Sequence, residues 1–190
     1  MKFCSECGSQ NISILTPEAN QSQHEVCHDC DAIFYKNPKI VAACILEWHN
    51  EILMCRRSIE PRKGMWTIPG GFMENGESVQ EAALRETKEE SGAQVSSPEL
   101  FAIYNLKNNN QVYAVYCGGL VDGVCSAEHE TEEVRLYKKD QIPWPNIAFL
   151  VIEAALRLYL ENCKMGVVYQ AKELTNGIHA LSISALTPEE

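Results

Sequence analysis

The stretch that decides the fold of this 190-residue chain runs from Gly71 to Ala93 and reads GFMENGESVQEAALRETKEESGA. Its second half carries the signals of a helix with defined ends. Ser78 is a favourable N-cap, and Glu81, three residues later, completes a capping box. Gly92 stands where helices commonly end in a left-handed turn. The sequence therefore predicts a helix that begins just after Ser78 and ends at Gly92.

Three acids of this helix fall on one face. Glu86, Glu89 and Glu90 are spaced i, i+3 and i+4, and at this spacing like charges destabilise an isolated helix by a few tenths of a kcal/mol per pair. Clustered carboxylates are ligands that Mg²⁺ or Mn²⁺ prefers. The neighbouring Arg85 can hold a carboxylate or a phosphate through two hydrogen bonds. The alternative is an ordinary solvated acidic face, which is common in helices of this composition.

The spacing G-x5-E-x7-R-E-x-x-E-E-x-G resembles the Nudix box of the Nudix hydrolase superfamily, on Gly71, Glu77, Arg85, Glu86, Glu89, Glu90 and Gly92. The resemblance implies that Glu86, Glu89 and Glu90 bind the catalytic Mg²⁺ or Mn²⁺, with the Gly71 carbonyl as a further ligand. It also implies that Arg85 and Glu77 pair and hold the loop and the helix in register. The general base stays open between Glu86 and the loop acids Glu130 and Glu133.

Composition limits the classes of partner. Apolar residues make up 45% and charged residues 22%, which is ordinary for a globular protein. The net charge of −10 argues against nucleic acid or an anionic membrane as the partner. No apolar run approaches the roughly 20 residues that span a bilayer, and the N-terminus lacks the apolar region of a signal peptide. We therefore expect a cytoplasmic protein that binds a polyanion through metal ions and local basic groups.

Four of the nine cysteines form two CxxC pairs, Cys4 with Cys7 and Cys27 with Cys30, separated by 19 residues. This spacing predicts a four-thiolate zinc site that is closed and therefore structural. Disulfides or a redox pair are the alternatives. We read the nearby His24 and His28 as surface residues, and the five scattered cysteines as mostly core positions: Cys44, Cys55, Cys117, Cys125 and Cys163.

The remaining chain alternates strands with helices. Residues 40–48 and 52–57 are expected to form a hairpin that turns at His49 and Asn50. Further strands are expected at 95–106, 111–121 and 134–137, and a helix at 147–162. The pattern predicts a layered α/β domain with one helix on each side of a sheet, and the resemblance implies an α-β-α sandwich with a mixed sheet. The predicted division is a zinc ribbon at 1–35, a Nudix hydrolase domain at 36–170 and a C-terminal tail at 171–190.

The resemblance extends beyond the box to the zinc-ribbon-bearing Nudix hydrolases, on Cys55-Arg-Arg57 and Gly64-x-Trp66-Thr-Ile-Pro-Gly-Gly-Phe72. Ile142-Pro-Trp and the helix after it are similar to the branch containing a plant chloroplast FAD/ADP-ribose pyrophosphatase. The NADH pyrophosphatases carry a Ser-Gln-Pro-Trp signature that this sequence lacks. The implied reaction is Mg-dependent hydrolysis of X-P-P-Y, either FAD to FMN and AMP or ADP-ribose to AMP and ribose phosphate. The alternatives are an NADH pyrophosphatase or a non-catalytic nucleotide-binding zinc-ribbon protein.

Substrate-binding candidates lie around the box. Phe72, Tyr113 and Tyr104 are candidate platforms for an adenine or flavin ring. Arg57 stands just before a basic loop and is a candidate for contact with phosphate. The sequence leaves open whether Trp66 lies in the core or lines a pocket. The family also implies a homodimer.

Overall fold

The computed structural model describes residues 1–16, 22–161 and 167–170. It divides the chain into two compact units, Met1–Pro38 and Lys39–Glu190, so the first unit ends slightly later than the predicted residue 35. The predicted tail at 171–190 and Cys163 lie outside the described residues. Within the described ranges, no helix is both long enough and apolar enough to cross a bilayer.

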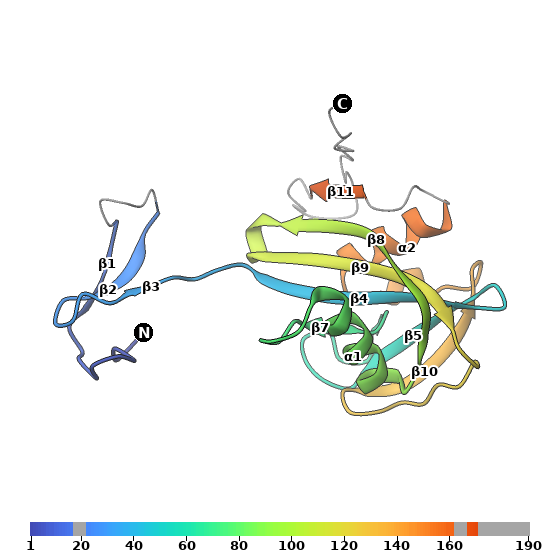
Figure 1. Ribbon diagram of the computed structural model, residues 1–190. Coiled ribbons are helices and arrows are strands. Elements are labelled where there is room, and N and C mark those ends of the chain that lie inside the picture. The colour runs from blue at the N-terminus through green and yellow to red at the C-terminus, as the bar shows by residue number, and fades with distance from the viewer. Residues whose placement is uncertain (17–21, 162–166, 171–190) are drawn as a thin grey trace. The chain divides into compact units, whose positions relative to one another are not determined.

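The second unit is built on one mixed sheet (Figure 1). Its strand order is β10-β5-β4-β9-β8-β11, with β6 paired to β5 and β7 to β4. The β4–β9 and β8–β11 pairs are parallel and the other pairs are antiparallel. The strands are β4 Lys39–Trp48, β5 Glu51–Arg57, β6 Trp66–Thr67, β7 Gly70–Phe72, β8 Val95–Leu106, β9 Gln111–Leu120, β10 Thr131–Lys138 and β11 Val167–Gln170.

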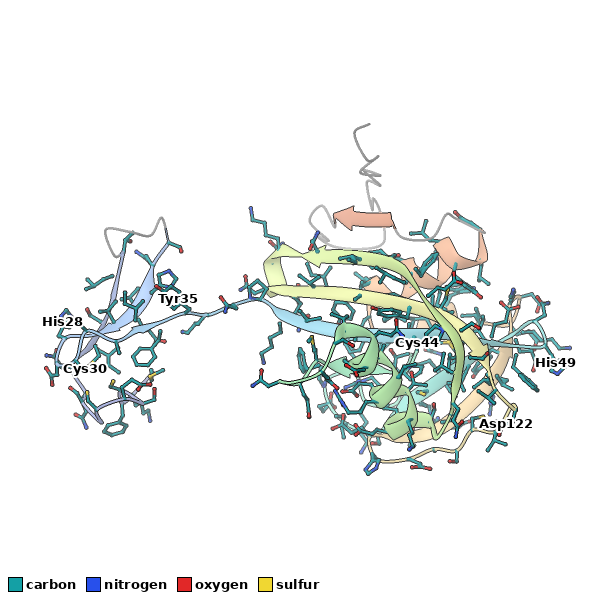
Figure 2. The ribbon with its side chains drawn as sticks, viewed as in Figure 1. His28, Cys30, Tyr35, Cys44, His49 and Asp122 are labelled. Atoms are coloured by element: carbon teal, nitrogen blue, oxygen red, sulfur yellow. The ribbon has the colours of Figure 1, made fainter. Side chains whose placement is uncertain are left out.

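Helices cover the two faces of this sheet, α1 (Val79–Ser91) on one and α2 (Leu150–Leu160) on the other (Figure 1). The central strand β4 explains why both faces need a helix. Successive side chains of a strand point to opposite faces, and both sets are apolar here. Cys44 and its alternate neighbours belong to a core cluster that includes Ala82 of α1, whereas Ile45 belongs to the cluster that includes Val151 of α2. Cys44 is labelled within the sheet in Figure 2. The predicted α-β-α sandwich with a mixed sheet is confirmed.

The hairpin between β4 and β5 is shorter than expected. His49 and Asn50 form the turn with φ of 47° and 67°, and His49 stands at the tip in Figure 2. The two strands pair only at Glu47 with Ile52 and at Trp48 with Glu51. Beyond these pairs, β7 takes the place beside β4, and β10 and β6 flank β5. This separation makes room for β7, which carries the Nudix-box residue Gly71.

The second helix begins at Leu150. The sequence had predicted a start three residues earlier, at Ile147. A short 3-10 turn at Trp144–Asn146 precedes it. Ile147 then forms a parallel bridge with Trp66, and the Ala148 N–H donates to the Trp66 carbonyl at 2.8 Å. Because the backbone of Ile147 and Ala148 pairs with Trp66, it cannot take helical geometry, and the helix starts only after Phe149. A second 3-10 turn, Lys107–Asn109, connects β8 to β9.

The first unit is a three-stranded antiparallel ribbon of β1 Ile12–Leu15, β2 His24–Cys27 and β3 Ile33–Phe34. Two tight turns carry its cysteines. The Gly8 N–H donates to the Cys4 carbonyl at 2.9 Å, and the Cys27 N–H donates to the Ala32 carbonyl at 2.9 Å. The Glu25 carboxylate forms ion pairs with Lys36 at 3.0 Å and with the N-terminal ammonium of Met1. Few side chains of this unit are buried, as expected of a unit that a metal holds together.

Candidate active site

The strand β7 and the helix α1 lie against each other in opposite directions. The Gly70 N–H donates to Glu90 Oε2 at 3.0 Å. A Cβ on Gly71 would stand 2.5 Å from the Glu86 carboxyl carbon, and Arg85 Nη2 donates to the Phe72 carbonyl at 3.1 Å. Successive residues of the strand thus meet residues of the helix in reverse order. This register places the box acids along the glycine strand.

The helix ends are those that the sequence predicted. Ser78 accepts a hydrogen bond from the Glu81 N–H at 3.2 Å, and the Ser78 N–H donates to the Glu81 carboxylate at 2.7 Å. Gly92 takes the left-handed conformation, with φ of 61°, and its N–H donates to the Lys88 carbonyl at 2.8 Å. Both predicted caps are confirmed. The helix is therefore held at both ends with its acidic face toward β7.

Arg85 is the hub of the charged groups. Its Nε and Nη2 donate to the two oxygens of Glu77 at 3.0 and 2.8 Å, and its Nη1 donates to Glu86 at 2.8 Å and to Glu89 at 3.2 Å. The hydrogen bond from Arg85, followed by one from the Glu74 N–H, lowers the pKa of the Glu77 carboxyl to about 2. Such a bidentate pair orients both partners. Arg85 therefore ties the loop before the helix to the acidic face.

The three acids lie at different depths. The Glu90 residue is 7% exposed, and the side chains of Glu86 and Glu89 are 16% and 50% exposed. Burial raises the pKa of Glu90 to about 7, with a further rise from the charge of Glu86 and an opposing effect of the Gly70 N–H. Burial also raises the pKa of Glu86, against the hydrogen bond from Arg85. A cation that binds Glu90 near pH 7 would therefore compete with a proton for its carboxylate.

The raised pKa of Glu90 predicts a pH dependence of stability. A folded pKa of about 7, above the reference value of 4.5, means that the folded chain binds this proton more tightly than the unfolded chain does. Stability without added magnesium should therefore fall as pH rises from about 4.5 to 7, by up to about 3 kcal/mol. Glu90→Gln should reduce this dependence to what Glu86 contributes, since burial also raises the pKa of Glu86. Calorimetric unfolding between pH 5 and 7.5 measures it. Glu99→Gln, at an exposed acid, is the control, and parallel profiles for Glu90→Gln and wild type would contradict the prediction.

These groups form the wall of a cleft of about 1110 Å³. Every substrate-binding candidate of the sequence analysis except Tyr104 lines it. The lining residues that bear on the chemistry are Arg57, Gly71, Phe72, Arg85, Glu86, Glu89, Glu90, Tyr113, Glu130 and Phe149. The cleft can thus bring a bound molecule against carboxylates, a guanidinium and aromatic rings at once.

Three candidates lie elsewhere. Tyr104 is fully buried in the core cluster that faces α2, so it offers no platform to a ligand. Trp66, left open by the sequence, is a core residue whose ring meets the ring of Tyr137 edge to face at 5.1 Å. Glu133 does not line the cleft, and its carboxylate pairs with Arg56 and Arg135. Of the two loop acids proposed as general base, only Glu130 reaches the cleft.

The sequence analysis missed Phe149 as a lining residue. The expected helix at 147–162 placed it inside a helix, whereas it has an extended backbone just before Leu150. The Arg57 guanidinium lies over its ring, 5.2 Å from the centroid. The Arg57 Nε also donates to the Pro61 carbonyl at 2.8 Å, which positions the side chain. No periodic signal in the sequence distinguishes this aromatic from a core residue.

The donor set of the cleft suits a hard divalent cation. Mg²⁺ and Mn²⁺ prefer carboxylate oxygens, and three carboxylates line the cleft side by side along one helix. Arg85 donates to one oxygen each of Glu86 and Glu89, and the Gly70 N–H donates to one oxygen of Glu90, so these bonds leave a second oxygen on each carboxylate. The residues therefore fit the ions that the family implies.

The four ribbon cysteines do converge. Cys4 Sγ lies 3.6 Å from Cys30 Sγ, and Cys7 Sγ lies 3.6 Å from Cys27 Sγ, and all four sulfurs lie within 4.8 Å of one another. A ZnS₄ tetrahedron with bonds of about 2.3 Å has edges of about 3.8 Å. Neither His24 nor His28 belongs to this cluster, and His28 contacts Ser13 instead. The cluster therefore fits a structural zinc ion.

Comparison with known proteins agrees with both units. The family model of the NUDIX domain matches residues 36–155, and the model of the Nudix N-terminal zinc ribbon matches residues 2–36. A NUDIX hydrolase crystal structure from Nitrosomonas europaea has a TM-score of 0.84 and 38% identity, covering 91% of this chain and all of the other.

Curated relatives with named activities are more distant. An ADP-ribose pyrophosphatase of Methanocaldococcus jannaschii is 30% identical over 113 residues, which are 57% of this chain and 67% of the relative. The NAD-capped RNA hydrolase NudC of Vibrio atlanticus is 34% identical over 103 residues, 53% of this chain but only 35% of the relative. On the domain match and the fold, the chain belongs to the Nudix hydrolase family of pyrophosphohydrolases and carries a zinc ribbon of the Nudix type at its N-terminus.

Proposed function

We propose that this chain hydrolyses the diphosphate of a nucleoside diphosphate linked to a second moiety, with FAD or ADP-ribose as substrate and Mg²⁺ or Mn²⁺ as cofactor. The observation that carries the proposal is the register of β7 on α1, which sets Glu86 and Glu90 against the glycine strand in the wall of a large cleft. The divalent ions supply charge neutralisation for the diphosphate and a lowered pKa for bound water.

In this proposal the chain's own residues have separate tasks. Glu86, Glu89, Glu90 and the Gly71 carbonyl hold the ions. Arg85 and Glu77 hold the loop and the helix in register, because their bidentate pair joins the two segments. The register keeps the ligands aligned when substrate enters.

The proton of the attacking water needs an acceptor in the cleft. Glu130 lines the cleft, and its charge raises the pKa of both Glu86 and Glu90, which indicates that it lies near them. Glu133 is the weaker candidate, because it does not line the cleft and its carboxylate pairs with Arg56 and Arg135. The general base is therefore Glu130 or Glu86. Glu130→Gln with intact metal ligands would separate the two.

The named relatives point to different substrates. The Methanocaldococcus relative is named for ADP-ribose, whereas the Vibrio relatives are named for NAD-capped RNA. The latter favour NADH as the second candidate. The net charge of −10 favours a small nucleotide over an RNA chain. We also propose a cytoplasmic homodimer, on the family resemblance and the composition.

A substrate panel tests the proposal directly. The full chain, loaded with zinc, is incubated with FAD, NADH and ADP-ribose in the presence of MgCl₂, and the products are separated by chromatography. Release of AMP together with FMN or ribose phosphate is the expected result. A preference for NADH would select the second candidate. Release of AMP from none of the three would leave a binding role as the better explanation.

A further inference from the structure

We propose that Phe149, under the Arg57 guanidinium, is a specificity-determining platform for a planar ring of the substrate, at the opposite end of the acidic face from Phe72. The inference rests on the proposed diphosphate hydrolysis and deepens it. It assigns the cleft to diphosphates that carry a planar ring on each side, such as FAD and NADH, more than to ADP-ribose, which carries one.

The order of contacts along α1 separates the two rings. The Phe72 carbonyl accepts a hydrogen bond from Arg85. At the other end of β7, the Gly70 N–H donates to the Glu90 carboxylate. Arg85 and Glu90 are five residues apart, which is about 7.5 Å of helix. Arg57 belongs to the Glu90 end, because the segment that contacts Glu90 also pairs with it: the Glu128 N–H donates to the Glu90 carbonyl at 3.4 Å, and Thr131 pairs with Arg57. The carboxylates therefore lie between an aromatic ring at each end.

Each of these rings already has a cation over its face. Lys39 Nζ lies 4.8 Å from the centroid of Phe72, and the Arg57 guanidinium lies 5.2 Å from that of Phe149. A basic group beside an aromatic ring can bind a phosphate while the ring stacks on the planar group that a sugar links to that phosphate, since guanidinium groups stack as well as donate hydrogen bonds. The two ends of the cleft thus repeat one kind of recognition element.

The surroundings of Phe149 are those of a binding wall. Phe149, Ile59 and Leu150 all line the cleft, and the last two are apolar residues that are 37% and 40% exposed. Phe149 itself is half-buried and packs partly on the core cluster that faces α2. The competing explanation is that its ring only fills space beneath the helix. The two explanations differ in how substrates respond to its removal.

The test compares Phe149→Leu, Phe149→Tyr and Phe72→Leu on FAD and ADP-ribose. Stacking of one ring is worth about 1–3 kcal/mol, so losing a platform should lower kcat/KM by about fivefold or more. We expect kcat/KM for FAD to fall by this factor in both leucine variants, chiefly because KM rises. Phe149→Tyr should retain the wild-type kcat/KM and KM. ADP-ribose carries one ring, so its kcat/KM should fall in only one of the two leucine variants.

Other patterns overturn the inference. Unchanged FAD kinetics in Phe149→Leu, equal losses in its Leu and Tyr variants, or loss of ADP-ribose hydrolysis in both leucine variants would each assign Phe149 to packing. Thermal unfolding of each variant shows whether packing is damaged. If the wild type hydrolyses neither substrate, the proposed function fails. Titration of FAD in CaCl₂, followed by flavin fluorescence anisotropy, then still tests Phe149: unchanged affinity in Phe149→Leu rejects it.

Discussion

Glu89→Gln should lower kcat/KM by more than about 100-fold, because even groups that only orient metal ligands commonly cost 10- to 100-fold. The fold should persist. Glu89 is 50% exposed and accepts a 3.2 Å hydrogen bond from Arg85, and surface ion pairs of this kind contribute at most about 1 kcal/mol to stability. Steady-state rates over a range of MgCl₂ concentrations and the melting temperature measure the two effects.

The matched control is Glu99→Gln. It removes the same charge from an exposed residue of β8 that does not line the cleft. This variant should keep wild-type rates. If Glu89→Gln also keeps them, Glu89 is no metal ligand, and the acidic face of α1 is reduced to Glu86 and Glu90.

Gly71→Ala should cost activity to a similar extent for a steric reason. The new methyl group would stand 2.5 Å from the carboxyl carbon of Glu86, well inside contact distance. Either the carboxylate moves or β7 moves away from α1. A displacement of about 1 Å in a catalytic site can cost about 100-fold in rate. Because the group it meets is the end of a flexible side chain, the carboxylate can move aside and the fold should change little.

Gly119→Ala provides the comparison for this variant. Its added Cβ would meet the Ser96 hydroxyl at 2.9 Å, a clash somewhat milder than that at Gly71, on β9 and away from the cleft. It should affect the melting temperature and not kcat/KM per folded molecule. Wild-type kinetics in Gly71→Ala would show that Glu86 does not depend on its place beside the glycine strand.

Local signals made the first helix predictable. The capping box at Ser78 and Glu81 and the left-handed turn at Gly92 are properties of neighbouring residues, and the structure has each of them where the sequence placed it. The strands with alternating or continuous apolar residues were predictable for the same reason, and Val95–Leu106 agrees to the residue. Four cysteines at a defined spacing likewise identified the ribbon cluster.

Other features depend on partners far away in the sequence. The β7 strand is Gly-Gly-Phe, which has almost no side-chain pattern, and it exists because β4 and α1 hold it. The late start of α2 depends on the pairing of Ala148 with Trp66. The difference between Glu130 and Glu133 depends on Arg56 and Arg135. These contacts could not be predicted from the sequence spacing of the residues that make them.

The contacts of Arg85 have a consequence for how the chain behaves between catalytic cycles. Its guanidinium acts as an internal counter-ion that offsets part of the charge of Glu86 and Glu89. A Mg²⁺ ion held by these carboxylates, as proposed, would compete with Arg85 for their oxygens and would also have to lose water ligands, which this ion does reluctantly. The hydrogen bonds of Arg85 to Glu77 and to the Phe72 carbonyl do not involve these two carboxylates. In the proposed mechanism, Arg85 and a dissolved Mg²⁺ therefore compete for the acidic face, and activity should follow the free magnesium concentration.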